Sequence, residues 1–312
     1  MSKKIITRMS NELGNQLFMY ASTFAISKKL NRELLIDNET SFKSRKNISR
    51  YGLDSFQINS AIASKKDKFL GIKGYIKRKI LKKVNRFLYL KKFYTENKDK
   101  NKITKYHDDF NKLNFSDKVY FEGHFETEKY FLDFKNQIIK EFTFKDEYKY
   151  KDNFYFNKIN QVNSVSICLR QNRFVEGRGR DNNENTLKSN KFSDEQIDYI
   201  NKSIKYIKNK IDNPSFYLWS NDLDSINIGR FNTKINMIKH KENSIKNIDK
   251  RALDLFLISK CNHHIVIPSS FNWWGAWLSL KNNKIICRPH DDTFSTFKVN
   301  NLDFWPTNWI KI

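Results

Sequence analysis

The sequence predicts an α/β protein built on parallel sheets. Its first forty residues read as strand, helix and strand, and strands alternate with helices again from residue 165 onward. This alternation is typical of doubly wound parallel sheets. The chain has 312 residues, of which 39% are apolar and 15% aromatic. That length is enough for two domains with proper cores and without disulfides.

The N-terminal half opens with a βαβ unit. Lys4–Thr7 is a short strand, Leu17–Leu30 has the apolar spacing of a helix, and Leu34–Ile36 resumes as a strand. The polar residues 11–16 are expected to form a turn. Residues 142–163, rich in Lys, Asn and Asp, are the best linker candidate.

We therefore expect an N-terminal domain over residues 1–155 and a C-terminal domain over residues 156–312. In the second domain Ser193-Asp194-Glu195-Gln196 fits a capping box that opens a helix. Ligands of parallel sheets bind at the carboxyl ends of the strands, so residues that follow strands are the candidates for chemistry. The expected strands are Val165–Leu169, Phe216–Trp219, His264–Ile267 and Lys284–Cys287, and the expected helices are Ser193–Lys210, Asp249–Lys260 and Trp273–Leu280.

The charge of the chain points to an anionic partner. The net charge is +24, and twelve Lys or Arg against one acid lie between Lys65 and Lys92. Codon drift in an A/T-rich genome is the competing explanation and accounts for part of the excess, but drift spreads charge, whereas the charge of this segment is concentrated. Nucleic acid, an anionic lipid surface and a phosphorylated ligand all fit.

Other features favour a cytoplasmic protein. No apolar run is long enough for a spanning helix, and the first ten residues lack the apolar core of a signal peptide. The three cysteines, Cys168, Cys261 and Cys287, are too few and too far apart for a disulfide framework or a paired-cysteine zinc site.

Residues 69–88 form a basic amphipathic helix. Apolar residues recur at 69, 72, 76, 80, 84, 87 and 88, and the opposite face holds Lys73, Lys77, Arg78, Lys82, Lys83 and Arg86. Either the apolar stripe packs on the domain and the basic face is solvated, or the helix contacts a membrane surface or the acceptor.

Phosphate would have to bind outside the familiar glycine-rich loops, because neither GxxxxGK[ST] nor GxGxxG occurs. Arg170 follows a strand and is either a bidentate phosphate clamp or half of a surface salt bridge. Ser269, Ser270 and Phe271 precede a helix and form either an anion site or an ordinary N-cap.

Two acidic residues follow a third strand. Asp222 can accept hydrogen bonds from a base or ribose, and with Asp224 it matches a weak manganese-binding pattern of glycosyltransferases. His263 and His264 are adjacent on a strand, so they point to opposite faces and cannot share a metal ion.

Several segments resemble the α-1,2-fucosyltransferases, glycosyltransferase family 11, and they follow the family's order from end to end. The closest block is the long one near the C-terminus. The segments are Leu13–Ala21 (LGNQLFMYA, against GGLGNQxFxYA), Gly123–Phe131 (GHFETEKYF, against GYFQSEKYF), Ile167–Phe174 (ICLRQNRF, in the place of HVRRGDY), Leu218–Asp222 (LWSND), Asp254–Leu278 (DLFLISKCNHHIVIPSSFNWWGAWL) and Phe304–Ile312 (FWPTNWIKI).

The resemblance implies a GT-B-like enzyme of two Rossmann-type domains with the cleft between them. The N-terminal domain would shape the acceptor side, and the C-terminal domain would hold GDP-fucose. Arg170 would bind the diphosphate and act in catalysis, Asp222 would bind guanine, and Ser269, Ser270 and Phe271 would bind a phosphate. Gly14, Asn15 and Gln16 would line the cleft, and Trp273, Trp274 and Trp277 would pack behind the helix.

The chain departs from the family pattern at two places. The two glycines before the Leu-Gly-Asn-Gln run are Asn11 and Glu12, and the histidine, second arginine, glycine and aspartate of HVRRGDY are Cys168, Gln171, Asn172 and Arg173. These changes indicate a rearranged donor loop, altered donor specificity or lost activity. We favour an active subgroup in which the basic loop 176–181 supplies replacement phosphate contacts.

The expected reaction is inverting transfer of L-fucose from GDP-fucose to a galactoside-type hydroxyl, forming an α-1,2 linkage, in bacterial O-antigen or capsule synthesis. Arg170 would stabilise the leaving GDP, and no metal or other cofactor is expected. Glu12, Glu126 and Asp181 are the candidate bases. The acceptor is expected to be a glycan, with a lipid link and peripheral contact at the inner face of the plasma membrane left open, and no nucleic acid is expected. Another nucleotide-sugar transferase on this scaffold, a basic nucleic-acid-binding protein and a non-catalytic glycan-binding protein are the alternatives.

Overall fold

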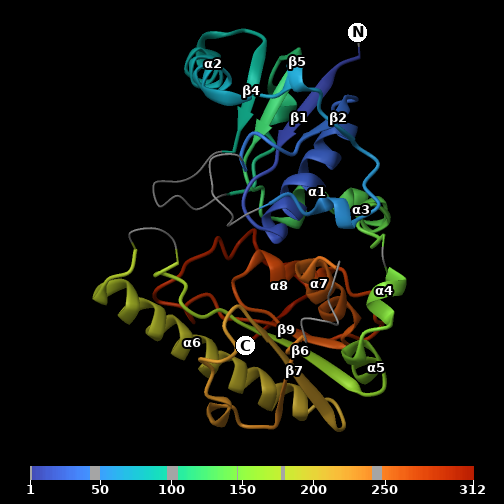
Figure 1. The fold of residues 1–312 in the computed structure, drawn as a ribbon, viewed down its shortest axis with the longest axis vertical. Helices are drawn as coiled ribbons and strands as arrows, with labels where there is room; N and C mark the ends of the chain where they lie inside the picture. The colour runs from blue at the N-terminus through green and yellow to red at the C-terminus, as the bar shows by residue number, and fades with distance from the viewer. Residues whose placement is uncertain (1, 43–49, 97–104, 146, 177–179, 241–247) are drawn as a thin grey trace. The chain divides into compact units, whose positions relative to one another are not determined.

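The computed structural model describes residues 2–42, 50–96, 105–145, 147–176, 180–240 and 248–312. The chain divides into two compact units, each with its own sheet (Figure 1). Unit 1 comprises Met1–Lys145 and Leu302–Pro306, and unit 2 comprises Asp146–Asn301 and Thr307–Ile312. Almost at its end, therefore, the chain returns to the first unit for five residues.

Unit 1 contains a five-stranded parallel sheet with the order β3-β2-β1-β5-β4. The βαβ opening is confirmed, because β1 and β2 pair in parallel and are joined by α1. The strands are β1 (Lys4–Arg8), β2 (Glu33–Asp37), β3 (Ala61–Ile62), β4 (Lys91–Thr95) and β5 (Phe115–Glu122), and the helices are α1 (Leu13–Lys29), α2 (Gly71–Val84) and α3 (Lys135–Glu141).

Unit 2 contains a six-stranded parallel sheet with the order β11-β10-β9-β6-β7-β8. Read from β8, this is the Rossmann order 3-2-1-4-5-6. The predicted doubly wound sheet is confirmed. The strands are β6 (Asn163–Leu169), β7 (Pro214–Ser220), β8 (Ile235–Met237), β9 (His263–Ile265), β10 (Ile286–Arg288) and β11 (Ile310–Lys311), and the helices are α4 (Glu147–Lys151), α5 (Phe154–Asn160), α6 (Asn183–Lys208), α7 (Lys250–Lys260) and α8 (Ser270–Trp277).

Three helices begin earlier than the sequence predicted. Helix α1 begins at Leu13 and not at residue 17, because the Glu12 carbonyl already accepts hydrogen bonds from the N–H groups of residues 15 and 16. Helix α6 begins at Asn183, where the Asn182 side chain caps it. The capping box proposed at Ser193 therefore lies inside a helix. Helix α8 begins at Ser270 and not at residue 273.

The boundary between the units lies at residue 145 rather than 155. The segment predicted to be a linker folds as α4 and α5, and both helices pack on α7. The rings of Tyr150 and Phe156 lie 5.3 and 5.6 Å from that of Phe256, and Lys260 pairs with Glu147 at 3.3 Å. These contacts attach residues 147–160 to unit 2.

Helix α2 forms within the predicted residues, but its faces are reversed with respect to simple core packing. Arg78 and Lys82 pair with the buried Glu122 at 2.5 and 2.7 Å, while Ile72 and Ile80 are exposed. Burial raises the pKa of Glu122, but the hydrogen bonds and charges of Arg78 and Lys82 outweigh that effect and hold the pKa below its usual value. Two of the six cations of the predicted basic face, Arg78 and Lys82, thus face the unit, whereas Lys73, Lys77, Lys83 and Arg86 are exposed.

The core of unit 2 confirms the structural reading of the tryptophans. Trp273, Trp274 and Trp277 are buried and pack on one another with ring centroids 5.0 to 6.0 Å apart. Gly275 brings α8 against α7, since a Cβ there would lie 2.2 Å from Ile258. Among the described residues, no helix has both the length and the apolar composition to cross a bilayer.

Candidate functional site

Both sheets have a point where the strand order reverses, and crevices for ligands form at the carboxyl ends of the strands there. In unit 2 this point lies between β6 and β9, and in unit 1 it lies between β1 and β5. The residues that follow these four strands are therefore the candidates for chemistry. Each unit is described by itself below.

In unit 2 the loops after β6 and β7 are joined by hydrogen bonds. The N–H of Gln171 donates to Asn221 Oδ1 (2.9 Å), and Asn221 Nδ2 donates back to the Gln171 carbonyl (3.1 Å). Asn172 Nδ2 donates to Asp222 Oδ2 (3.4 Å). These bonds bring Asp222 to the loop that begins at Arg170, as the sequence predicted for residues that follow neighbouring strands.

The first turn of α8 joins the same edge. Asn272 is fully buried, accepts a hydrogen bond from the N–H of Ile267 (2.7 Å) and donates to Cys168 Sγ (3.2 Å). Burial raises the pKa of the Cys168 thiol, with the nearby Asp254 adding to the effect. Cys168 is therefore a neutral thiol that ties the end of β6 to α8.

Ser269, Ser270 and Phe271 are partly exposed at the start of α8. Ser269 is the N-cap residue, but its side chain caps no backbone N–H. The hydroxyl is therefore not used as the ordinary N-cap would use it. The helix dipole and the N–H groups of the first turn favour an anion at a helix N-terminus.

Arg170 combines the two alternatives that the sequence left open, a salt bridge and a guanidinium group that can bind an anion. Its Nη2 pairs with Glu176 at 2.5 Å, so the salt bridge exists. Its Nε is buried and has no hydrogen-bond acceptor in the part of the chain that the structure describes. A buried donor without an acceptor costs free energy, and an oxygen of a bound anion would remove that cost.

The departures from the family pattern in this loop have local explanations. Asn172 stands where the family has glycine and has a φ of 56°, and Asn tolerates this left-handed conformation better than most residues. Gln171 accepts a hydrogen bond from Ser193 Oγ (2.8 Å), which attaches it to α6. The guanidinium of Arg173 lies over the ring of Phe297, 4.9 Å from its centroid. The proposed replacement contacts at residues 177–179 lie outside the described residues.

The two aspartates after β7 have different partners. Asp222 accepts the weak bond from Asn172, whereas Asp224 pairs with Lys239 at 2.7 Å and is 90% exposed. The ion pair with Lys239 lowers the pKa of Asp224. Within residues 2–42, 50–96, 105–145, 147–176, 180–240 and 248–312, no group of three His, Cys, Asp or Glu side chains is placed to hold a metal ion.

The paired histidines belong to the core of unit 2. His263 Nδ1 accepts the N–H of Ile285 (3.0 Å), and His264 Nδ1 lies 2.8 Å from Ser166 Oγ. The two side chains thus have separate partners, as their adjacency on one strand predicted. Burial lowers the pKa of both imidazoles, well below the usual value for His264, and the neighbouring Lys284 adds to the effect at His264.

Sequence reasoning missed three groups at this edge. Arg288 ends β10, is mostly buried, and directs Nη1 to Asp291 (2.9 Å) while its Nε has no acceptor in the described chain. His240 is buried and pairs with Asp254 at 2.7 Å. Glu176 pairs with Arg170. Arg288 was recognisable as a cation after a strand, whereas the pairing of residues 240 and 254 left no signal in the sequence.

In unit 1, Gly14, Asn15 and Gln16 form the first turn of α1, beside the end of β1. The resemblance implied that Gln16 lines a cleft, but its side chain is fully buried. Its Nε2 donates to the carbonyls of Asn11 and Arg50 (2.8 Å each), and its Oε1 accepts a hydrogen bond from the N–H of Gly52 (3.0 Å). Gly14 is buried as well, and Asn15 is partly exposed. Gln16 therefore fixes the loops around the helix start.

Asn11 explains the other departure from the family. It stands where the family has glycine and has a φ of 61°, so asparagine again keeps a left-handed backbone conformation. Its Nδ2 lies 2.7 Å from His124 Nε2. The residue that replaces a glycine thus also contacts the loop after β5.

That loop, residues 123–126, is held in a strained shape. Phe125 has a φ of 53°, which is a genuine outlier for a bulky residue, and strain of this kind concentrates at functional sites. The buried Glu96 accepts the N–H groups of His124 (2.7 Å) and Phe125 (2.9 Å). Gly123 is required, since a Cβ there would lie 2.4 Å from that of Glu96.

The strained loop presents His124 and Glu126 next to the start of α1. His124 Nδ1 lies 3.9 Å from Glu126 Oε1, and the same oxygen accepts a hydrogen bond from Asn15 Nδ2 (2.9 Å). Both side chains are about a quarter exposed. Glu126, one of the three candidate bases, thus has a histidine beside it.

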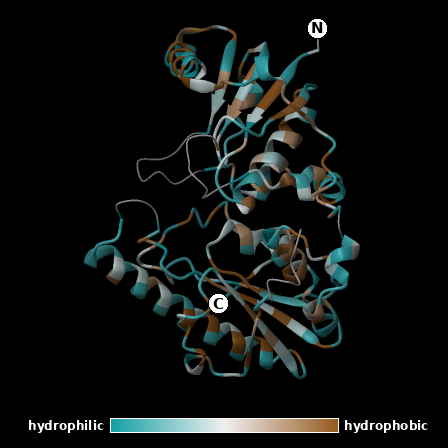
Figure 2. Cartoon of the chain, in the orientation of Figure 1, coloured by the Kyte–Doolittle hydropathy of each residue, from teal (hydrophilic) through white to brown (hydrophobic). Residues whose placement is uncertain are grey.

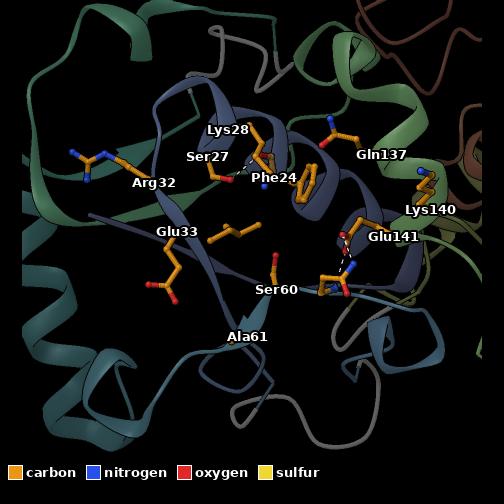
Figure 3. A pocket seen from close by; sticks show the side chains of 12 residues that line it. Phe24, Ser27, Lys28, Arg32, Glu33, Ser60, Ala61, Gln137, Lys140 and Glu141 are labelled. Atoms are coloured by element: carbon orange, nitrogen blue, oxygen red, sulfur yellow. Dashed lines mark hydrogen bonds between the residues drawn. The ribbon is translucent and has the colours of Figure 1, made fainter. Parts of the chain in front are cut away.

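Described residues of unit 1 line a smaller and a larger cavity. One of about 190 Å³ lies at the carboxyl ends of β1, β4 and β5 and is lined by Arg8, Ser10, Met19, Lys82, Thr95, Glu96, Glu122, Gly123 and His124. The other, of about 520 Å³, lies at the amino end of β2, where Glu141 bonds Asn59 (Figure 3). The smaller cavity is at the edge where parallel sheets bind ligands, so it is the better candidate despite its size.

Comparisons with known proteins agree with this picture. The model of the family described as Glycosyl transferase family 11 matches residues 2–312. The chain is 28% identical over 319 residues to an alpha-1,2-colitosyltransferase of Escherichia coli, covering 99% of this chain and 98% of that protein. It is 24% identical over 296 residues to the O-antigen biosynthesis glycosyltransferase WbnK of Escherichia coli, covering 90% and 92%.

Solved structures show the same fold. NodZ alpha-1,6-fucosyltransferase soaked with GDP-fucose matches with a TM-score of 0.54 at 13% identity, over 89% of this chain and 93% of that chain. A mutant of Arabidopsis thaliana FUT1 in complex with GDP matches with a TM-score of 0.51 at 12% identity, over 93% and 71%. The GT-B-like class with two Rossmann-type units is confirmed. Because the family model covers nearly the whole sequence, the chain belongs to glycosyltransferase family 11.

Proposed function

We propose that this glycosyltransferase transfers L-fucose from GDP-fucose to a galactoside hydroxyl, with inversion and an α-1,2 linkage, during O-antigen synthesis. The observation that carries the proposal is the buried Nε of Arg170, which lies at the switch point of the sheet in unit 2 and has no acceptor among the described residues. A diphosphate oxygen supplies that acceptor. The names of the two Escherichia coli relatives support the linkage and the pathway.

The donor half of the site is formed by three loops of unit 2. Arg170 and the start of α8 at Ser269, Ser270 and Phe271 hold the diphosphate, and Asp222 accepts hydrogen bonds from guanine. As the bond from the sugar to the phosphate breaks, the electron pair leaves with GDP. The guanidinium and the helix N–H groups stabilise this charge, so no metal ion is needed.

We assign the acceptor half to the cavity of unit 1 and the proton to His124. With Nδ1 protonated on the side of Glu126, Nε2 has the lone pair that a general base requires, and the amide of Asn11, 2.7 Å from Nε2, must give up this contact when the acceptor hydroxyl binds. The acceptor hydroxyl attacks the anomeric carbon and passes its proton to Nε2. Glu126 is a positioning residue here. His124→Asn should abolish the acid limb of the pH profile of kcat/KM, and an unchanged acid limb contradicts the assignment.

A second donor, GDP-colitose, is favoured by the 28% identical colitosyltransferase. Colitose lacks the 3-hydroxyl of fucose, so the choice between them depends on contacts to one hydroxyl. Turnover with GDP-fucose, GDP-colitose, GDP-mannose and UDP-sugars, together with the thermal shift that each causes, decides between these donors. Stabilisation by UDP-sugars and not by GDP contradicts the proposed donor site.

Arg170→Lys tests the diphosphate contact itself. Lysine keeps the charge but loses the planar fork that grips two oxygens. Loss of one such electrostatic contact costs about 10²–10³ in kcat, and the Kd for GDP should rise as well. A variant with near-normal turnover would remove Arg170 from the mechanism.

The acceptor is proposed to be a lipid-linked glycan, and the enzyme to work at the inner face of the plasma membrane. The concentrated charge of residues 65–92 supports this part of the proposal. Transfer to a lipid-linked acceptor in vesicles, compared with the same glycan in solution, tests it. Equal rates on the two acceptors contradict a membrane setting.

A further inference from the structure

Helix α2 is attached to unit 1 through polar contacts on one side. Arg78 and Lys82 pair with Glu122 at 2.5 and 2.7 Å. At the end of the helix, Asn85 Nδ2 donates to the carbonyl of Phe93 in β4 (2.9 Å), and Asn85 Oδ1 accepts the N–H of the same residue (3.0 Å). No residue of α2 itself is buried. The helix thus lies on the unit without inserting an apolar face into it.

The other side of the helix exposes large apolar residues. Ile72, Ile76, Ile80 and Phe87, here named the outer stripe, are 79%, 50%, 56% and 74% exposed. Ile72, Ile76 and Ile80 follow one another at intervals of four residues, which places them on one face of α2, and Phe87 lies in the 3₁₀ turn Asn85–Phe87 that follows the helix. Single exposed apolar residues are common, but a continuous row of them on one helix marks an interaction surface.

Positive charges border the outer stripe. Lys73, Lys77, Lys79, Lys83 and Arg86 are all exposed, and no acid occurs between Asp67 and Glu96. In Figure 2 the turns of α2 carry brown as well as teal segments, in keeping with this mixture. A row of apolar side chains flanked by cations is typical of helices that lie in the interface of an anionic bilayer.

We propose that α2 binds the surface of a membrane that contains anionic lipids, with the outer stripe inserted among the acyl chains and the flanking cations on the headgroups. Two features favour a bilayer over the other partners. Nucleic acid offers phosphates but no apolar layer for the stripe, and a second copy of this chain would bring like charges together.

The inner side of the same helix points to the purpose of the contact. Lys82 and its partner Glu122 line the cavity of about 190 Å³ that carries His124. A glycan on a lipid anchored in that membrane would therefore be held close to the cavity. This step rests on the proposed function, whereas membrane binding itself does not.

Co-sedimentation with vesicles, without donor or acceptor, tests the binding. The protein should bind vesicles of phosphatidylcholine with phosphatidylglycerol, lose affinity as salt rises, and leave pure phosphatidylcholine vesicles unbound. Lys73→Gln with Lys77→Gln should weaken binding by about fivefold per charge. Ile76→Ser with Ile80→Ser should weaken it by roughly tenfold or more.

Matched controls lie on α6 of unit 2. Leu187→Ser removes an apolar side chain that is 69% exposed, and Lys202→Gln with Lys205→Gln removes two exposed charges; neither change should alter binding. Turnover of a soluble acceptor by the Ile76→Ser, Ile80→Ser variant should stay normal, which separates this inference from the proposed function. The membrane proposal would be overturned if the protein bound neutral vesicles, bound no vesicles, or bound them equally well after the α2 substitutions. A dimer that the Ile76→Ser, Ile80→Ser variant abolishes, or equal affinity for random duplex DNA, would also overturn it.

Discussion

If Arg170 binds the donor diphosphate as proposed, Glu176 competes with the donor for its guanidinium. Its Oε2 accepts from Arg170 Nη2 at 2.5 Å, and its Oε1 accepts from Asn221 Nδ2 at 3.2 Å. A diphosphate bound to the same guanidinium is also an anion, so it must displace this carboxylate. Glu176→Gln removes the charge and keeps an oxygen for Asn221. We therefore expect the variant to bind GDP more tightly than the parent protein.

The magnitude follows from the exposure of the pair. The side chains of Arg170 and Glu176 are 38% and 33% exposed, so solvent screens their attraction. Exposed pairs contribute about 0.2–1 kcal/mol. If that free energy no longer stabilises the unbound state, the Kd for GDP should fall by about 1.5- to 5-fold.

Calorimetric titration with GDP at two salt concentrations measures the effect. The gain should shrink at higher salt, because added ions screen the pair further. Glu184→Gln is the matched control, since it breaks a similarly short pair with Lys188 (2.6 Å) on α6 and changes the net charge equally. Unchanged or weaker GDP binding in Glu176→Gln, or an equal gain in the control, refutes the competition.

Three more outcomes are expected. Turnover should persist in EDTA, since Asp224 is paired with Lys239 and the proposed diphosphate contacts are a guanidinium and the start of a helix; loss of activity restored by Mn²⁺ would revive a metal site. Arg173→Asp should lower activity and stability, because it removes the contact with Phe297, worth about 0.5–1 kcal/mol, from an adapted loop; a faster enzyme would indicate decay instead. The free energy of unfolding should fall as pH drops below about 6.5, by up to roughly 1.4 kcal/mol per pH unit for His264, since only the unfolded chain binds that proton. Urea titrations at several pH values measure this dependence, and the free energy of unfolding of His264→Asn should change less with pH. An equal pH dependence in the variant counts against His264 as its cause.

The strands were predictable because buried parallel strands are short apolar runs, and β1, β6 and β7 were found within two residues at each end. The starts of α1, α6 and α8 were not, although that of α7 was found within one residue. The first turn of α1 is polar because Gln16 bonds Arg50 and Gly52, which are distant in the sequence. Because these partners are brought together only by the fold, a local sequence pattern cannot predict them.

The backbone conformation at the positions that depart from the family pattern could not be predicted from the sequence either. Asn11 and Asn172 look like losses of glycine, yet both keep a left-handed backbone. Arg173 looks like a charge reversal beside the donor, yet its guanidinium lies over Phe297. A substitution can therefore change the residue type and still preserve the shape of a loop. The φ angle shows whether the shape is preserved.

Helix α2 shows the limit of periodicity most clearly. An amphipathic pattern defines two faces, but it does not state which face packs on the protein. That choice was made by Glu122, which is buried at the end of β5 and needs the cations of Arg78 and Lys82 because a buried carboxylate must be paired. Once Arg78 and Lys82 face the unit, Ile72, Ile76 and Ile80 face outward together with the remaining cations. One buried charge, some forty residues from the helix, thus converts a core-packing pattern into an exposed surface.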